Sequence, residues 1–588
     1  MLVAGAVVLL FAAVVLILPK DSFWITDGGN RFIQLQSLQR TGQLSIEYPA
    51  EAIDPYKTFF PRGGHHFQQH DDAIHSFYPI YFSLIVSPFY RVLGGVGLYV
   101  LPLLGTLLTL IMSCKILNEL GDRRRDGQTV LVLALCTPIF FYSLTFWEHT
   151  LAVGLSTLAI YYLLRILNGQ HLKWGAAVSG VLLGVSTIFR EEGYIIFVAI
   201  VVAMSLLIYQ KRAPFLRGSL LHVVLGWGAV MLPVGWFQYA TYGNVLGIHA
   251  AVYSSMETST PTAPWEYLWG KLTNFYVYLF RFNEQAIVNY CLVVPLALIT
   301  CYGLIIPKDS SKRKNIIFAI GVLLSAVLMV LLFVHPNPVF NTLNTQALVS
   351  ATPFLLVLVF LQREVLRSSD PGPRFLGVIV LVYVAATCLS LNQSDIGIIW
   401  GPRHFLALYP IVVPLVFYGL LRIADDGKSV LFRKLAIVLF VVSALIQVHG
   451  VSTLFLKKNA TRQLVEKVAQ LDETVIVTDV FWLGEELASI FYDKKIMQVE
   501  SDSEMLALVP QLAAKDIDRF AIVRSPWFQA IRDPQTLQEM TRLLIIEPGG
   551  ELRFPRVSLL DVNIFTCRWR QNGKRQAPQA APLQPADM

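Results

Sequence analysis

The chain has 588 residues, of which 55% are apolar and only 15% are charged, and its mean hydropathy is +0.55. Because charged residues make up about a quarter of an average soluble protein, this composition excludes the soluble class and predicts a polytopic membrane protein. The formal net charge of +7 does not indicate nucleic-acid binding, because the basic residues form short clusters between apolar runs, as signals that orient membrane helices do.

The cysteines and the first residues indicate neither a disulfide scaffold nor a cleaved leader. Five of the six cysteines lie within apolar runs, so neither a disulfide framework nor a CxxC metal pattern is available. Residues 1–18 are apolar, lack the basic start of a signal peptide and have no small-residue cleavage site before Lys20. We therefore expect a first transmembrane helix that is retained.

Apolar runs of roughly 20 residues, the length that a hydrocarbon core of about 30 Å requires, recur along the chain. They predict about 13 transmembrane helices, near residues 1–19, 97–117, 129–147, 149–167, 174–190, 193–210, 219–238, 286–306, 316–334, 346–361, 375–391, 404–422 and 435–455. Basic clusters such as Arg123–Arg125 and Lys312–Lys314 follow alternate spans, which predicts a cytoplasmic amino terminus and an extracytoplasmic carboxyl-terminal part.

This orientation requires that the apolar segment at residues 76–93 does not cross the membrane. The segment contains Pro79 and Pro88 among tyrosines and serines, so we interpret it as an interfacial helix in the membrane plane; a crossing helix is the alternative. Residues 20–96 then form a first extracytoplasmic loop within a membrane domain at 1–455.

After Leu456 the composition changes. The runs ETVIVTD, KKIMQVE and RFAIVRS are short and β-branched, and polar helical stretches separate them. This alternation predicts a small, soluble, extracytoplasmic α/β domain at residues 456–570. The end of the chain, 571–588, is rich in Pro, Gln and Ala, and we expect it to be disordered.

The first candidate functional residue is Asp27, which follows Phe23 and Trp24 and opens DGGNRFIQLQSLQRTGQL. One interpretation is that Asp27 is only the N-cap of a short interfacial helix. The functional interpretation is a carboxylate held at the membrane surface, which takes a proton from an acceptor hydroxyl during attack on an activated carbon.

A second candidate group lies in GGHHFQQHDDAIH, which contains Asp71, Asp72, His65, His66, His70 and His75. Carboxylates and imidazoles this dense could hold a divalent ion, but the spacing matches no specific metal signature. A solvated loop is the simpler interpretation, and we expect no metal here. A second acidic group that assists Asp27 is the preferred functional interpretation.

A third group consists of charged residues at span ends on one predicted side of the membrane: Glu148, Arg190, Glu191, Glu192 and Arg403. Charges that border hydrocarbon are costly enough to be functional candidates. Arginines at that depth suit a phosphate, which they grip through parallel hydrogen bonds. The alternative is structural, with Arg190 pairing with Glu148 or Glu191 to tie helices together.

Four segments carry a resemblance to a known family: TDGGNRF at Asp27, SFYPIYFSLIVSPFYRVLG at 76–94, FREEG at 189–193 and WGPRHFLALYP at 400–410. With the order of the first span and first outer loop, they resemble the GT-C-type membrane glycosyltransferases. The match is closest to the branch of the protein O-mannosyltransferases and the aminoarabinose transferases that modify lipid A. It covers roughly residues 1–455.

The resemblance implies a polyprenyl-phosphate sugar donor, an active site on the extracytoplasmic face and Asp27 as catalytic base. Many members have two adjacent acidic residues at that place, whereas here Gly28 follows Asp27, so Asp71 or Asp72 could supply the second carboxylate. Many members also have a KPP or HPP type sequence where this chain has 76–79. Around it, His75 and Tyr78 are candidate acceptor-side or structural residues, as are Glu148, Glu191 and Glu192.

The sequence hypothesis is therefore an inverting hexosyl- or pentosyltransferase in the plasma or inner membrane, with Arg190 and Arg403 as donor phosphate ligands, no cofactor, and a lipid, glycan or protein acceptor. A transporter or lipid-linked-sugar flippase is a second class. It predicts charges near the bilayer midplane, and the spans at 316–334, 346–361 and 375–391 have none. A non-catalytic scaffold is a third class.

Overall fold

The structure of the chain is a computed structural model. It describes residues 2–63, 65–70, 72–122, 124–170, 172–248, 264–280, 347–366, 368–391, 398–422, 428–526, 533–555, 557–571 and 574. The predicted spans near 286–306 and 316–334, Asp71 and nearly all of the predicted disordered tail lie outside these residues.

The chain divides into two compact units. The first comprises Met1–Ile17, Val96–Gly247 and Ser255–Leu454, and the second comprises Leu18–Gly95, Ile248–Ser254 and Phe455–Met588. The sequence assigned the loop at 20–96 to the membrane domain, whereas the structure groups it with the C-terminal residues. The reason is local packing, because the helix that contains Asp27 lies against a short helix of the C-terminal part.

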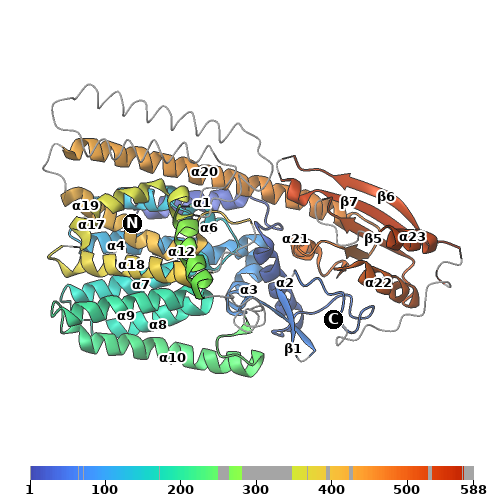
Figure 1. The fold of residues 1–588 in the computed structure, drawn as a ribbon, viewed down its shortest axis with the longest axis horizontal. Helices are drawn as coiled ribbons and strands as arrows, with labels where there is room; N and C mark the ends of the chain where they lie inside the picture. The colour runs from blue at the N-terminus through green and yellow to red at the C-terminus, as the bar shows by residue number, and fades with distance from the viewer. Residues whose placement is uncertain are drawn as a thin grey trace. The chain divides into compact units, whose positions relative to one another are not determined.

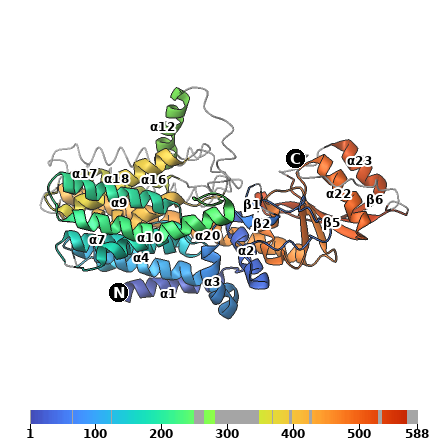
Figure 2. The ribbon, with the colours of Figure 1, turned by 90° about the horizontal axis from the view of Figure 1, so that it is seen from below.

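The described part of the first unit consists of helices and the segments that connect them (Figures 1 and 2). They are α1 (Leu2–Ile17), α4 (Val100–Glu119), α5 (Asp126–Leu135), α6 (Ile139–Ser143), α7 (His149–Leu167), α8 (Gly175–Phe189), α9 (Glu192–Tyr209), α10 (Leu216–Tyr242), α12 (Pro264–Phe280), α16 (Leu348–Ala351), η2 (Pro353–Leu355), α17 (Leu356–Leu366), α18 (Pro371–Ser390), η3 (Arg403–Leu408), α19 (Tyr409–Arg422) and the first part of α20 (Lys428–Ala469).

Seven helical stretches in the described part are long and apolar enough to cross a membrane: Tyr81–Glu119, His149–Leu167, Glu192–Tyr209, Leu216–Tyr242, Pro371–Ser390, Arg403–Arg422 and Phe432–Ala469. The helices α1, α5 and α8 are also apolar but shorter. The chain is thus a polytopic helical membrane protein. The predicted total of about 13 spans stays a prediction.

Glycines set how closely the helices of the first unit pack. A Cβ atom on Gly180 of α8 would lie 2.2 Å from the main-chain oxygen of Val223, and one on Gly226 of α10 would lie 2.3 Å from that of Ala177. The two backbones therefore touch at small residues, as helices in membranes commonly do. Figure 1 shows α8 between α7 and α10, and α8 packs against both.

The predicted span at 129–147 differs from the structure. Helix α5 ends at Leu135 and the short α6 begins at Ile139, so one continuous helix is absent there. Pro138 explains the break, because a proline disfavours helical geometry in the residue before it, here Thr137.

The amino-terminal part of the second unit contains α2 (Thr26–Thr41), the antiparallel hairpin of β1 (Phe67–His70) and β2 (Ala73–Ser76), and α3 (Tyr81–Leu93). Helix α3 packs on α2 and has 13 residues. At 1.5 Å per residue, that is about 20 Å, less than the roughly 30 Å of a hydrocarbon core. It ends at Gly94, whose φ of +57° favours glycine, and η1 (Gly94–Tyr99) follows.

The C-terminal part of the second unit holds a five-stranded sheet in the order β4-β3-β5-β7-β6. The strands are β3 (Val475–Thr478), β4 (Lys495–Gln498), β5 (Arg519–Arg524), β6 (Leu544–Leu552) and β7 (Val562–Trp569), and the connecting helices are α21 (Leu483–Glu486), η4 (Ala488–Ile490), α22 (Asp502–Ala514), α23 (Pro534–Leu543) and η5 (Ser558–Leu560). Strand β3 pairs in parallel with both β4 and β5. From β3 the chain goes on to β4 on one side of β3, and from β4 it crosses to β5 on the other side. The carboxyl ends of β3 and β5 therefore flank a switch point, which is where open α/β sheets bind ligands.

Candidate active site

Asp27 lies in the first turn of α2. The structure has Ile25 at the N-cap, with extended backbone angles, so the sequence interpretation of Asp27 as the N-cap is wrong. A carboxylate in the first helical turn is still favoured by the positive end of the helix dipole. The Asp27 side chain is not open to water, because the residue is only 5% exposed.

Polar side chains of α2 fasten this helix to the hairpin and the segment after it. Arg31 is 3% exposed, its Nη1 donates to the main-chain oxygen of Asp27 at 3.0 Å, and its Cζ lies 3.9 Å from the centre of the Tyr78 ring. Asn30 is fully buried; its Nδ2 donates to the main-chain oxygen of His66 at 2.8 Å, and its Oδ1 accepts from Ser76. The residues around Asp27 are therefore buried and paired by hydrogen bonds.

Glu485 of α21 completes this cluster, although it follows Asp27 by more than 450 residues. Its Oε1 lies 2.8 Å from Nδ1 of His66 and 3.5 Å from Nδ2 of Asn30, and its side chain is fully buried. Two glycines make room for it. A Cβ on Gly29 would lie 2.0 Å from the main-chain oxygen of Glu485, and one on Gly63, at φ +61°, would lie 2.7 Å from its carboxylate.

The charges of this cluster act on one another. Burial lowers the pKa of His66, but the negative charge and hydrogen bond of Glu485, with the charge of Asp27, outweigh it and raise that pKa to about 9. Burial raises the pKa of Glu485, against the lowering effect of His66, and Asp27 raises it further. At neutral pH His66 is thus a cation in contact with Glu485.

The other predicted residues of the first loop are spread over the hairpin. Asp72 is exposed, with a φ of +60°, and its main-chain oxygen accepts from Lys57. His75 is buried on β2, opposite Gln68. Within the described residues, no group of three or more His, Cys, Asp or Glu side chains is arranged to hold a metal ion.

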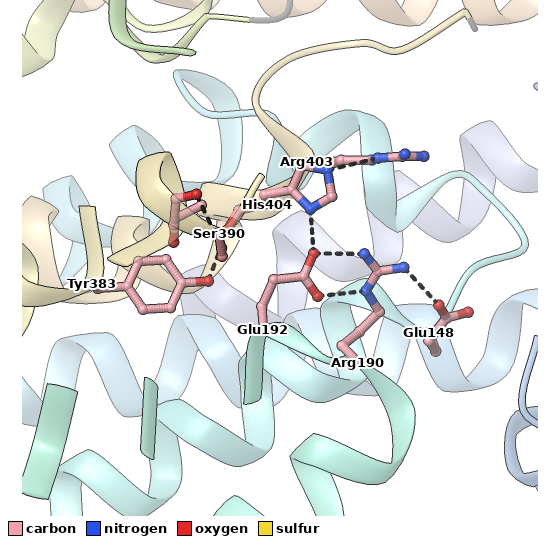
Figure 3. A network of polar contacts seen from close by, with 8 residues as sticks. Glu148, Arg190, Glu192, Tyr383, Ser390, Arg403 and His404 are labelled. Carbon is pink, nitrogen blue, oxygen red and sulfur yellow. Dashed lines mark hydrogen bonds and ion pairs between the residues drawn. The ribbon is translucent and has the colours of Figure 1, made fainter. Parts of the chain in front are cut away.

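A second polar network lies within the first unit (Figure 3). Arg190, after α8, grips Glu192 of α9 with Nε to Oε2 at 2.9 Å and Nη2 to Oε1 at 2.6 Å. Its Nη1 lies 3.2 Å from Oε1 of Glu148, which precedes α7. His404 of η3 brings Nδ1 to 2.6 Å from Oε1 of Glu192, and the main-chain oxygen of His404 accepts from Tyr383 of α18 at 2.7 Å.

This network borders a hollow of about 320 Å³, counting its part open to solvent. Its lining residues are His149, Ala152, Val153, Ser156, Ser186, Arg190, Glu192, Gly193, Ile196, Tyr383, Arg403, His404, Leu406 and Ala407. Cationic and apolar groups therefore line the same small, partly open hollow.

The structure brings together four of the five charged residues predicted at span ends, and Glu191 is exposed. The two carboxylates on Arg190 favour the structural alternative for this residue. Sequence reasoning missed His404 and Glu485. His404 stood beside Arg403 in the GPRH segment, and Glu485 followed a predicted strand at the edge where parallel strands place functional residues, so both had a signal.

No protein-family model and no curated protein sequence matches the chain. A polytopic helical membrane protein with buried polar sites is the class that the structure defines. Among solved structures it is similar to ArnT from Cupriavidus metallidurans bound to undecaprenyl phosphate, with 13% identity over 99% of each chain and a TM-score of 0.43. It is also similar to the Archaeoglobus fulgidus oligosaccharyltransferase in the apo form, with 12% identity, 88% of this chain and 69% of that chain covered, and a TM-score of 0.48.

A third similar structure is the archaeal oligosaccharyltransferase AglB from A. fulgidus in complex with an inhibitory peptide and a dolichol-phosphate, with 13% identity, 88% of this chain and 69% of that chain covered, and a TM-score of 0.47. By name, the last two of these structures are oligosaccharyltransferases and the first is an ArnT. At such identities and TM-scores, no residue role passes from those proteins to this chain.

Proposed function

We propose that this protein is a glycosyltransferase that moves a sugar from a polyprenyl-phosphate donor to an acceptor hydroxyl on the extracytoplasmic face of the membrane. The observation that carries the proposal is the cluster around Asp27, where a carboxylate in the first turn of α2 is buried with Arg31, Asn30 and Glu485, and the partly exposed His66 contacts Glu485. Buried, mutually perturbed titratable groups of this kind are typical of active sites.

Asp27 is the base in this proposal. It removes the proton from the acceptor hydroxyl while the hydroxyl oxygen attacks the sugar C1 and the bond from C1 to the phosphate oxygen breaks. Attack from the face opposite the phosphate inverts the configuration at C1. The phosphate is a good leaving group, so positioning supplies most of the rate, and the base contributes a factor of about 10²–10⁴.

The burial of Asp27 places a condition on this mechanism. At 5% exposure the carboxylate does not meet an acceptor unless substrate binding displaces a side chain above it. The same burial keeps water, which is a competing acceptor, away from the carboxylate in the absence of substrate. Hydrolysis of the donor without acceptor is therefore expected to be slow.

The hollow of the first unit is the proposed site of the donor. Arg190 and Arg403 supply positive charge, while Val153, Ile196 and Leu406 give an apolar wall. In this proposal Arg403, which lines the hollow, grips the donor phosphate, and Arg190, which two carboxylates hold, keeps the wall in place.

A transporter or flippase is the competing function. It would place charged side chains near the middle of the spans, where transporters bind their substrates. In the network described here the charges stand at helix ends instead: Glu148 precedes α7, Arg190 follows α8, Glu192 begins α9 and Arg403 begins η3. This placement favours a reaction at the membrane surface.

The test is consumption of the donor. Purified protein is supplied with radiolabelled polyprenyl-phosphate sugars, hexosyl and pentosyl, and with lipid, glycan and peptide acceptors. We expect acceptor-dependent release of polyprenyl phosphate, and a loss of about 10²–10⁴ in Asp27→Asn. Glu51→Gln, an exposed carboxylate in the same loop, is the control and keeps the wild-type rate. Normal transfer by folded Asp27→Asn would remove Asp27 from the mechanism, and an unconsumed donor would favour the transporter.

A further inference from the structure

We propose that Glu485 supplies the second carboxylate of the Asp27 site and that His66 is the positioning residue that keeps both carboxylates ionised together. The sequence left the second carboxylate open between Asp71 and Asp72. This inference rests on the proposed function, since it concerns the state of the proposed base. It also assigns the C-terminal residues a part in the chemistry, through α21.

The geometric basis of this proposal is the close fit of Glu485 against residues of the first loop. Glu485 lies on α21, which packs against α2 and follows the carboxyl end of β3. Gly29 and Gly63 leave no space for a Cβ beside it, and Gly63 adopts a φ of +61° that favours glycine. Both glycines belong to sequence segments singled out for chemistry, so those segments are shaped around this one glutamate.

The charged and polar groups that face His66 and Glu485 come from two helices, α2 and α21. His66 meets the charge of Glu485 from α21 and those of Asp27 and Arg31 from α2. Glu485 meets His66, Asp27 and the amide of Asn30. Arg31 opposes protonation of His66, and the two carboxylates favour it.

The consequence for Asp27 follows from charge balance. Two carboxylates that share a buried site repel each other, and one of them then binds a proton at a higher pH. The imidazolium of His66 cancels this repulsion, so Asp27 stays ionised and able to accept a proton. Without His66, Glu485 becomes an uncompensated neighbour that favours a protonated, inactive Asp27.

The first test is the pH profile of kcat/KM. In His66→Gln the acid limb should move upward by about one pH unit or more, because the compensating cation is gone. Adding Glu485→Gln to His66→Gln should move the limb back toward its wild-type position, because the repelling carboxylate is gone too. A merely structural role predicts the opposite, a double variant worse than either single one. His70→Gln, at the exposed end of β1, is the matched histidine control.

The second test needs no activity. Of the two forms of a histidine, diethyl pyrocarbonate modifies only the neutral imidazole. The His66 side chain is 27% exposed, so peptide mass spectrometry can follow the modification of this one residue against pH. In the wild type the rate should rise near pH 9, and in Glu485→Gln the rise should occur at a lower pH. An unchanged modification profile, an unmoved acid limb in His66→Gln, or no recovery in the double variant would overturn the inference. Should His66→Gln fail to fold, the wild type and Glu485→Gln still decide it. Failure of the proposed function would be seen separately, as an active Asp27→Asn.

Discussion

Lys457 of α20 places its Nζ 2.6 Å from both carboxylate oxygens of Glu486, and the side chains of the two residues are 0% and 5% exposed. The same Nζ donates to the main-chain oxygen of Phe23 at 2.8 Å, and Thr461 donates to Glu486 at 3.0 Å. One buried ion pair thus ties α20, the segment before α2 and α21 together within the second unit.

Removing the charge of Lys457 should therefore lower the free energy of unfolding. Lys457→Met leaves Glu486 buried without its cation, and such a change destabilises a protein by about 3–5 kcal/mol. The double variant Lys457→Met/Glu486→Leu should lose less stability than Lys457→Met, because it leaves no unpaired charge at this buried site. Thermal unfolding in detergent measures both. The control is Arg462→Met, which breaks an exposed pair with Glu466 on the same helix and should cost about 0.5 kcal/mol or less. Equal losses in Lys457→Met and Arg462→Met would contradict the role of the buried pair.

The contact between α8 and α10 gives a second stability prediction. Gly226→Ala forces a Cβ to 2.3 Å from the main-chain oxygen of Ala177, which separates the helices and should cost about 1–3 kcal/mol. Gly228, two residues further on the same helix, has nothing within 4 Å of an added Cβ. Gly228→Ala should therefore be neutral or stabilise by up to about 1 kcal/mol. Indistinguishable unfolding temperatures for the two variants would refute the close backbone contact.

The helical membrane class could be predicted because it rests on local information, the length of apolar runs. The break between α5 and α6 also had a local cause in Pro138, yet the apolar run hid it. Chain position alone suggested that Glu148, Arg190, Glu192 and Arg403 share one side, and the structure brings them into one network.

The position of Glu485 after a predicted strand was a signal, but its pairing with the first loop lay beyond such reasoning. Its partner His66 is 419 positions earlier in the chain, and no periodicity or motif joins residues at that separation. Gly29 and Gly63 were visible in the sequence, but a glycine reveals that space is needed and not which side chain needs it. The burial of Asp27 was missed for the same reason, because the groups that cover it come from distant segments.

Substitutions of Arg403 and Arg190 should have different effects, the first on the KM for the donor and the second on stability. Arg403→Gln removes a cation from the proposed phosphate site and should raise KM for the lipid-phosphate donor about tenfold or more. Arg190→Gln leaves Glu148 and Glu192 buried with no guanidinium and should lower stability by about 3–5 kcal/mol. Donor titrations and thermal unfolding of both variants check this. A donor KM that depends on Arg190 alone would reverse the two roles.

The orientation of the chain gives the last prediction. Basic clusters on alternate connections, such as Lys211 with Arg212, should stay in the cytoplasm, which places the C-terminal sheet outside. A cysteine at Glu551, whose side chain is 66% exposed on β6, should react with a membrane-impermeant maleimide on intact cells. A cysteine at Arg212, exposed between α9 and α10, should react only after the membrane is opened. The parent chain, labelled in parallel, accounts for its own six cysteines. Labelling of Arg212→Cys on intact cells with protection of Glu551→Cys would invert the topology and would put the Glu485 and Asp27 cluster on the cytoplasmic side, where the proposed reaction does not take place.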